Sequence, residues 1–196
     1  MSRSKARIRS RSSPRSLTLN PSGKNSDEPT DEDMGNFSYL CQCIGFVVVH
    51  WTLTEQQLDN WVNVCANNAG GKLFLEGKGV PQALKRKATF IKRCLRELPD
   101  LSAFRDECAG LLSRMLSASN RRHDLIHGAI TELKPDPVSG AFKFRRIGYV
   151  GDDHTLTEFT VTPNDFRVFA PVLTDLVTDS IAFSQKLGDK FLGPLE

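Results

Sequence analysis

The chain has 196 residues and a net charge of +3, with 39% hydrophobic and 25% charged residues. This length predicts one domain with a real core and a possible tail. No run of about 18 apolar residues and no secretory signal appear, so we expect no membrane span and a cytoplasmic protein. Six Lys and Arg and no acid lie in residues 1–16, residues 17–33 are acidic, and the remainder is nearly neutral. By charge alone, the folded part is therefore not a strongly basic nucleic-acid binder.

Five cysteines, an odd number without a Cys-x-x-Cys pair, argue against a zinc knuckle or a redox pair. Several fall on apolar helical faces, so we interpret them as small buried side chains in a reducing compartment. They are Cys41, Cys43, Cys65, Cys94 and Cys108.

Residues 1–35 are predicted to be disordered. Ser, Arg, Pro and Asp dominate there, and too few apolar side chains are present to offset the entropy of ordering. Their Arg- and Ser-rich start resembles an organelle transit peptide; an arm that contacts nucleic acid and an inert leader are the alternatives. We expect the folded domain to span residues 36–196.

The folded domain is predicted to begin with a long helix. From near Asn36, apolar residues follow steps of three, four and seven, which is the period of a helix face. Thr52 and Glu55 have the spacing of a capping box, so we consider a kink or a restart at that point. The apolar positions are Leu40, Ile44, Val47, Trp51, Leu58, Val62 and Cys65.

Two further helices are predicted after a glycine-rich connection at 67–79. The second helix starts at about Pro81, a residue suited to a first helical turn, and the third leads directly into residues 120–128. The second helix is basic, which we interpret as a solvated face; an RNA-guiding groove is the alternative, which the salt dependence of binding distinguishes. Its basic residues are Lys85, Arg86, Lys87, Lys92, Arg93 and Arg96.

The end of the chain is predicted to form a β-hairpin and a last helix. Turn residues at 135–140 precede two apolar stretches, so a hairpin is expected at about 141–161. Thr162, Pro163 and Asp165 then supply a cap, a proline at the first helical position and an acid at the third. The sum is an all-α fold, a bundle of four to five helices with a small β-hairpin inserted before the last helix.

Residues 120–128 read Asn-Arg-Arg-His-Asp-Leu-Ile-His-Gly and come directly after an apolar helix pattern. The simplest interpretation is a solvated helix end, where Arg121 and Arg122 complement the negative end of the helix and Gly128 terminates it. Three chemical interpretations compete with it.

Two of the chemical interpretations involve a metal ion. His123 and His127 lie four residues apart, so on a helix both face one way and are able to bind zinc, with His154 or Glu158 as a third ligand. Asp124 would then stand where metalloproteases carry a longer Glu. The second metal interpretation is a phosphohydrolase that uses a His, a His-Asp pair and a distant Asp. The residues that supply this order are His50, His123, Asp124 and Asp175 or Asp179.

The third chemical interpretation is phosphodiester cleavage without a metal. Attack of an RNA 2′-hydroxyl on the adjacent phosphate needs a base, a proton donor for the leaving 5′-oxygen and positive charge on the phosphorane. His127 and Arg122 are residue types that supply these functions. On a regular helix their side chains lie ~140° apart, so we expect two copies of the chain to bring two Arg–His pairs into one cleft.

The segment resembles the signature of the HEPN superfamily, which is an Arg, usually a polar residue, three to five further residues and a His. The commonest bacterial form reads Arg-Asn-x-Leu-x-His-Gly. The residues that match this form are Arg122, Leu125, His127 and Gly128, and His123 stands where Asn is common. Over residues 36–196, the long first helix and the position of the segment after a third apolar helix face are also similar to such domains.

The resemblance implies an all-α homodimer that often acts as an endoribonuclease, without a metal or other cofactor, in toxin–antitoxin, antiviral defence or stress-response systems. RNA would be its substrate, and an antitoxin or another protein its partner. His127 would transfer protons, Arg122 would clamp the phosphate, and Asp124 would orient a histidine or that arginine. Supporting roles fall to His123, Arg121 and Asn120, with Arg121 on the RNA backbone. The alternatives are a catalytically inactive, dimeric HEPN-like interaction module and a zinc-dependent hydrolase that uses His123 and His127.

Overall fold

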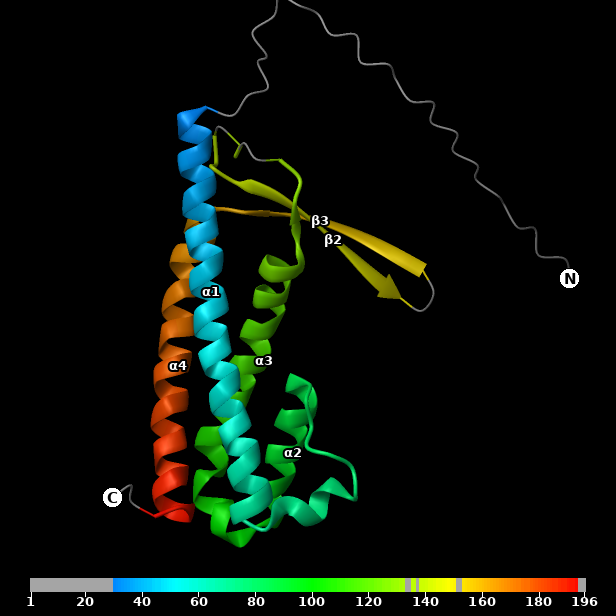
Figure 1. Ribbon diagram of the computed structural model, residues 1–196, viewed down its shortest axis with the longest axis vertical. Coiled ribbons are helices and arrows are strands. Elements are labelled where there is room, and N and C mark those ends of the chain that lie inside the picture. The colour runs from blue at the N-terminus through cyan, green and yellow to red at the C-terminus, as the bar shows by residue number, and fades with distance from the viewer. Residues whose placement is uncertain (1–29, 133–134, 137, 151–152, 194–196) are drawn as a thin grey trace, which may run out of the picture.

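The computed structural model describes residues 30–132, 135–136, 138–150 and 153–193, which form a mostly helical bundle with a small antiparallel sheet at one end (Figure 1). The α-helices of this part are α1 Asp31–Asn63, α2 Leu84–Glu97, α3 Arg105–His127 and α4 Pro163–Phe191. Its strands are β1 Ala129–Ile130, β2 Phe142–Val150 and β3 Asp153–Val161. The expected helical bundle with a hairpin before the last helix is confirmed at this level of description.

Helix α1 begins at Asp31, before the boundary that we expected near Asn36. Thr30 caps it: the Thr30 hydroxyl accepts a hydrogen bond from the Asp33 amide at 3.1 Å, and the Asp33 carboxylate accepts one from the Thr30 amide at 2.8 Å. The rest of the expected disordered tail, residues 1–29, lies outside the described residues. The expected kink at Thr52 is wrong, because the Thr52 hydroxyl donates to the Val48 carbonyl at 2.9 Å within one continuous helix.

Helices α1 and α4 are in extensive contact and lie side by side along the length of the bundle (Figure 1). Trp61 of α1 fixes their register: its indole nitrogen donates to the Ser184 hydroxyl at 2.7 Å, and its ring meets Phe183 edge-on with centroids 4.8 Å apart. The largest fully buried side chains of the pair are Leu40, Trp51, Leu58, Trp61, Leu173, Leu176 and Phe183. Their burial supplies much of the hydrophobic stabilisation of the bundle.

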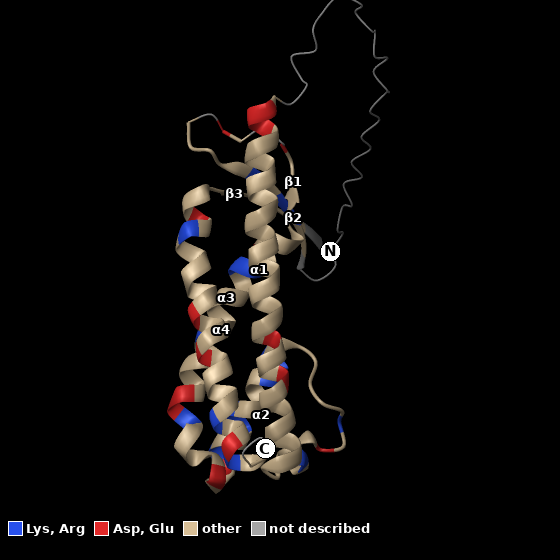
Figure 2. Ribbon diagram, turned by 60° about the vertical axis from the view of Figure 1, so that its left-hand side comes forward, with Lys and Arg blue, Asp and Glu red and all other residues tan. Residues whose placement is uncertain are grey.

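The helical stretch 31–68, which joins α1 to a π-helical turn at Val64–Asn68, is long and apolar enough, by length and composition, to cross a membrane. A helix of a protein core passes the same test. The inner face of α1 lies in the core, but Val48, Val49 and Leu53 remain exposed on its outer face. Figure 2 shows few charged residues along the middle of α1. Helix α1 therefore presents apolar side chains to the outside as well as to the core.

Helix α2 starts at Leu84, later than the expected start at Pro81, and packs against both α1 and α3. Before it, the chain forms a 3-10 turn at Gly71–Leu75. After it, a second 3-10 turn at Pro99–Phe104 reverses the chain into α3. Helix α3 therefore runs antiparallel to α2, and its C-terminal end points toward the sheet (Figure 1).

Strands β2 and β3 form the expected hairpin, with Phe144 opposite Phe159 and their rings stacked at 5.4 Å. The two-residue strand β1, which we did not predict, pairs antiparallel with β2 directly after α3. The expected start of α4 is confirmed: Thr162 and Asp165 form a capping box, with Pro163 at the first helical position. The sheet is thereby fixed between the end of α3 and the start of α4.

Candidate functional site

The segment Asn120–Gly128 occupies the last two turns of α3 and the residue that follows them. Leu125 is buried and anchors this helix end in the core. Asn120, His123 and His127 are exposed on the same helix end. The segment therefore presents polar side chains around one buried leucine.

Gly128 allows α3 to end in contact with the hairpin. A Cβ atom at this position would lie 2.7 Å from the Asp124 carbonyl oxygen, 2.9 Å from Phe159 and 3.0 Å from Phe144. These separations are shorter than van der Waals contact, so a larger residue would push the hairpin away from the helix end. Close approach, rather than a positive φ angle, is therefore the reason for glycine here.

Arg121 is bound to the start of α4. Its guanidinium donates to the Asp165 carboxylate at 2.6 Å and to the Asp165 carbonyl at 3.3 Å, and it lies over the Phe169 ring at 5.3 Å. Burial acts to raise the pKa of Asp165, but hydrogen bonds from Thr162 and the charge of Arg121 outweigh it and hold that pKa below its ordinary value. The contacts of Arg121 join α3 to α4, which is a structural role.

Asp124 pairs with Arg146 of β2. We expected this carboxylate to orient a histidine or Arg122, and the sequence did not single out Arg146 as its partner. The pair ties the hairpin to the last turn of α3. Because Asp124 and Arg146 neutralise one another, both of these charges serve the docking of the hairpin.

Arg122 has no carboxylate partner among the described residues. Its guanidinium lies over the ring of Trp51 on α1, with the Cζ atom 5.6 Å from the ring centroid. The buried Nε of Arg122 and the buried indole nitrogen of Trp51 both lack a hydrogen-bond partner within the described structure. The sequence placed Trp51 only on the apolar face of the first helix; its contact with Arg122 also places it in the candidate site.

His123 and His127 lie next to one another, with ring centroids 4.5 Å apart. Desolvation is the largest cause that lowers the pKa of His123 below its ordinary value of 6.5, and the neighbouring His127 and Arg146 lower it further. Asp124 acts in the opposite direction. His123 is therefore held in its neutral form at pH 7.

Of the two metal interpretations, the described side chains bring together only the neighbouring pair His123 and His127. No group of three His, Cys, Asp or Glu side chains that could hold a metal ion occurs in the described part of the chain. Glu158 pairs with Arg145 instead, and the side chain of His154 lies outside the described residues. His50 bonds to the Phe46 carbonyl and stacks on that ring, and Asp179 pairs with Arg114.

The charges of the segment thus fall into two groups. Arg121 and Asp124 are neutralised by residues of α4 and β2. Arg122 forms no ion pair in the described structure, and the titratable rings of His123 and His127 are exposed at the helix end. A guanidinium is able to bind a phosphate, and an imidazole is able to move a proton. No family model, no curated protein and no solved structure matches this chain.

Proposed function

We propose that the protein is a metal-independent endoribonuclease of the HEPN type. One observation supports the proposal most: within this segment Arg122 is the arginine that forms no ion pair. Arg121 and Asp124 are neutralised by ion pairs. Arg122 lies over Trp51 and has no carboxylate partner in the described structure. An arginine in this state has its planar donors available for phosphate oxygens. His127, which is exposed on the same helix end, is the proposed group for proton transfer.

In the proposed reaction, a neutral His127 takes the proton of an RNA 2′-hydroxyl. The 2′-oxygen attacks the adjacent phosphorus, and the bond from phosphorus to the 5′-oxygen breaks. A protonated histidine gives its proton to that leaving oxygen, so the products are a 2′,3′-cyclic phosphate and a 5′-hydroxyl. Arg122 stabilises the negative charge that develops on the phosphorane, and positioned proton transfer contributes about 10²–10⁴-fold to such a rate.

A second copy of the chain is part of the proposal. Arg122 and His127 lie ~140° apart around a regular helix, so one protomer does not close a site around a phosphate. Two copies around a two-fold axis bring two Arg–His pairs into one cleft, with one histidine as base and the other as acid. We place this dimer in the cytoplasm, in bacterial defence, a toxin–antitoxin pair or a stress response, because of the resemblance of the segment to the HEPN signature.

The second candidate function is a dimeric interaction module without catalysis. It is favoured by the outer face of α1, where Val48, Val49 and Leu53 are exposed in a stretch with few charges (Figure 2). Exposed apolar patches of this kind mark surfaces that associate. In this case the exposed side chains of the segment 120–128 would contribute to the interface between the copies.

Two substitutions separate the two candidates. We expect Arg122→Ala and His127→Ala each to lower RNA cleavage at least about 10²-fold while the variants remain folded and dimeric. Arg114→Ala on the same helix is the matched control, because Arg114 is paired with Asp179, and it is expected to cleave normally. Normal cleavage by both site variants would reject the nuclease, and loss of the dimer in either variant would favour the interaction module.

A further inference from the structure

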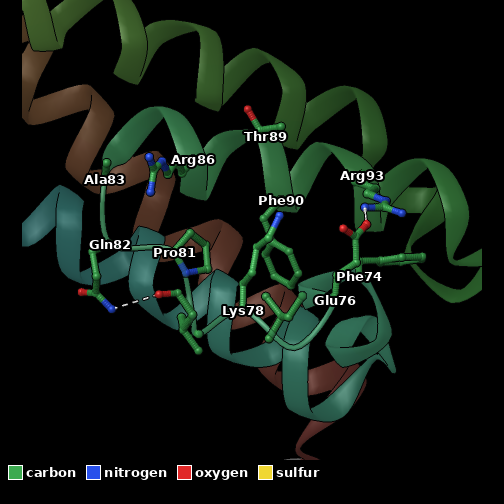
Figure 3. Close-up of a pocket in the computed structure, with 13 residues that line it drawn as sticks. Phe74, Glu76, Lys78, Pro81, Gln82, Ala83, Arg86, Thr89, Phe90 and Arg93 are labelled. Carbon is green, nitrogen blue, oxygen red and sulfur yellow. Dashed lines mark hydrogen bonds and ion pairs between the residues drawn. The ribbon is translucent and has the colours of Figure 1, made fainter.

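A hollow of about 720 Å³ lies between α2 and the segment that precedes it (Figure 3). This volume is within the range of about 300–1,000 Å³ that is typical of small-molecule sites. Its apolar wall is formed by Phe74, Leu75, Val80, Pro81 and Phe90. The hollow is therefore large enough to take a ligand with an apolar or aromatic part.

Cations surround the apolar wall. Arg86 and Lys78 line the hollow and are exposed; neither forms an ion pair in the described structure, although the charge of Lys78 helps to lower the pKa of Glu76. Arg93 lies over the Phe74 ring at 4.9 Å and pairs with Glu76 at 2.7 Å. Figure 3 shows Arg86 and the Arg93–Glu76 pair at opposite ends of the hollow, with Phe90 between them. The lining thus combines aromatic side chains with an excess of positive charge, because Lys78, Arg86 and Arg93 outnumber Glu76.

The start of α2 adds to this positive potential. Its N-cap, Ala83, lines the hollow and offers no side chain to the first amides of the helix. The N-terminal end of a helix carries a partial positive charge and favours an anion.

The turn at the edge of the hollow has an unusual backbone conformation. Glu76 is left-handed, with φ of 51°, which is uncommon for a residue other than glycine. Its ion pair with Arg93 holds that strained turn at the edge of the hollow.

We propose that this hollow binds a nucleotide of single-stranded RNA. Single-strand sites combine a positively charged groove with aromatic or guanidinium surfaces on which bases stack. Here the half-buried Phe74 and the guanidinium of Arg93 offer the stacking surface, the buried Phe90 forms the floor, and Arg86 and Lys78 are the cations for the phosphate. An acidic peptide would use the cations but would leave the aromatic wall without a partner.

The position of the hollow suits a strand that continues toward the candidate catalytic site. Helix α2 packs antiparallel against α3, so the N-terminal end of α2 is the end directed toward the turns of α3 that carry Arg122 and His127 (Figure 1). The hollow would hold part of the substrate away from the bond that is cut. This inference rests on RNA as the substrate of the proposed nuclease.

The test measures binding of a labelled single-stranded RNA to the full chain with His127→Ala, so that the RNA is not consumed. Added to this background, Arg86→Gln is expected to weaken binding about tenfold and to reduce the slope of log K against log salt by about 0.7, the effect of one phosphate contact on a single strand. Phe74→Leu keeps an apolar side chain but loses the aromatic plane, and is expected to weaken binding about fivefold without a change in slope. Thermal unfolding confirms that each variant is folded.

Lys92→Gln is the matched control, because Lys92 lies on the same helix, is exposed and does not line the hollow. It is expected to change the affinity by less than about twofold. Equal weakening by Lys92→Gln and Arg86→Gln, with no effect of Phe74→Leu, would overturn the proposal in favour of general charge attraction. Absence of RNA binding, or equal competition by polyglutamate, would also overturn it.

The cleavage assay tests the proposed nuclease and the binding assay tests the hollow, so the two proposals can be rejected separately. Cleavage by the wild type together with unaltered binding in the Arg86 and Phe74 variants rejects the hollow and leaves the nuclease intact. Binding that depends on Arg86 and Phe74, without cleavage by the wild type, supports the hollow as an RNA site and rejects the nuclease.

Discussion

The guanidinium of Arg122 lies over the indole ring of Trp51, 5.6 Å from the ring centroid. This contact joins the motif on α3 to the middle of α1. A cation over an aromatic face is stabilised by about 0.5–2 kcal/mol, depending on how far it is desolvated. Because Trp51 is only 2% exposed, its ring is fixed by the core and in turn fixes the position of Arg122.

Trp51→Phe tests this positioning role. The smaller ring binds a cation less strongly, and the indole N–H is lost, so we expect kcat for RNA cleavage to fall about tenfold with little change in KM. Trp61→Phe is the control, since Trp61 is also fully buried but donates to Ser184, away from the motif. It is expected to lower the unfolding midpoint without lowering kcat in the folded protein. Equal loss of kcat in both variants would show that Trp51 acts only through stability.

Arg146→Gln should raise the pKa of His123. Arg146 is one of the charges that hold this pKa below 6.5, and its removal also frees Asp124, which favours the protonated ring. NMR titration of the histidine ring protons measures the shift directly. Arg145→Gln is the matched control, because Arg145 is the next residue but pairs with Glu158. An unchanged His123 titration in Arg146→Gln would contradict the assigned cause.

Asp165 should contribute to acid sensitivity. Its folded pKa lies below the ordinary value of 3.8, so the carboxylate stabilises the fold above pH 3.8, and this contribution is lost as the pH falls through the folded value. Asp165→Asn is expected to lose about 1 kcal/mol at pH 7 and to show a shallower loss of stability below pH 3.8 than the wild type. Urea unfolding between pH 6 and 2.5 measures both effects, with the exposed Asp175→Asn as control.

Gly128→Ala should destabilise the protein by about 1–3 kcal/mol, because the added methyl overlaps the Asp124 carbonyl and two phenylalanine rings. Gly110→Ala on the same helix is the control: a Cβ there meets nothing within 4 Å. Since alanine is favoured over glycine inside a helix, Gly110→Ala is expected to stabilise by about 0.5–1 kcal/mol. Chemical denaturation measures both, and equal stabilisation by the two changes would contradict the close packing at Gly128.

The parts of the fold that could be predicted have local signals. The cap, proline and acid at Thr162, Pro163 and Asp165 marked the start of α4, and strand-like patterns with turn residues marked the hairpin. The capping box of Thr30 and Asp33 was an available signal for the start of α1, but the polar composition around it favoured a tail. The two-residue strand β1 has no pattern of its own, because only its pairing with β2 defines it.

The candidate site could be predicted only as a list of residues. The sequence placed Arg122, His123 and His127 on one helix end, but it gave no sign of which charges would be neutralised. The pairing of Asp124 with Arg146 and the contact of Arg122 with Trp51 join elements far apart in the chain. Such contacts follow from how the helices and hairpin pack, and a local pattern does not encode them.

The activity that we propose is cleavage of RNA by its own 2′-hydroxyl without a metal ion. The most direct measurement incubates the wild-type protein in EDTA with an RNA strand and with the same strand bearing 2′-deoxy nucleotides, and identifies the product ends. We expect cleavage of the RNA alone, with 2′,3′-cyclic phosphate and 5′-hydroxyl ends. Cleavage of the deoxy strand, or cleavage that EDTA abolishes and added metal restores, would contradict the account.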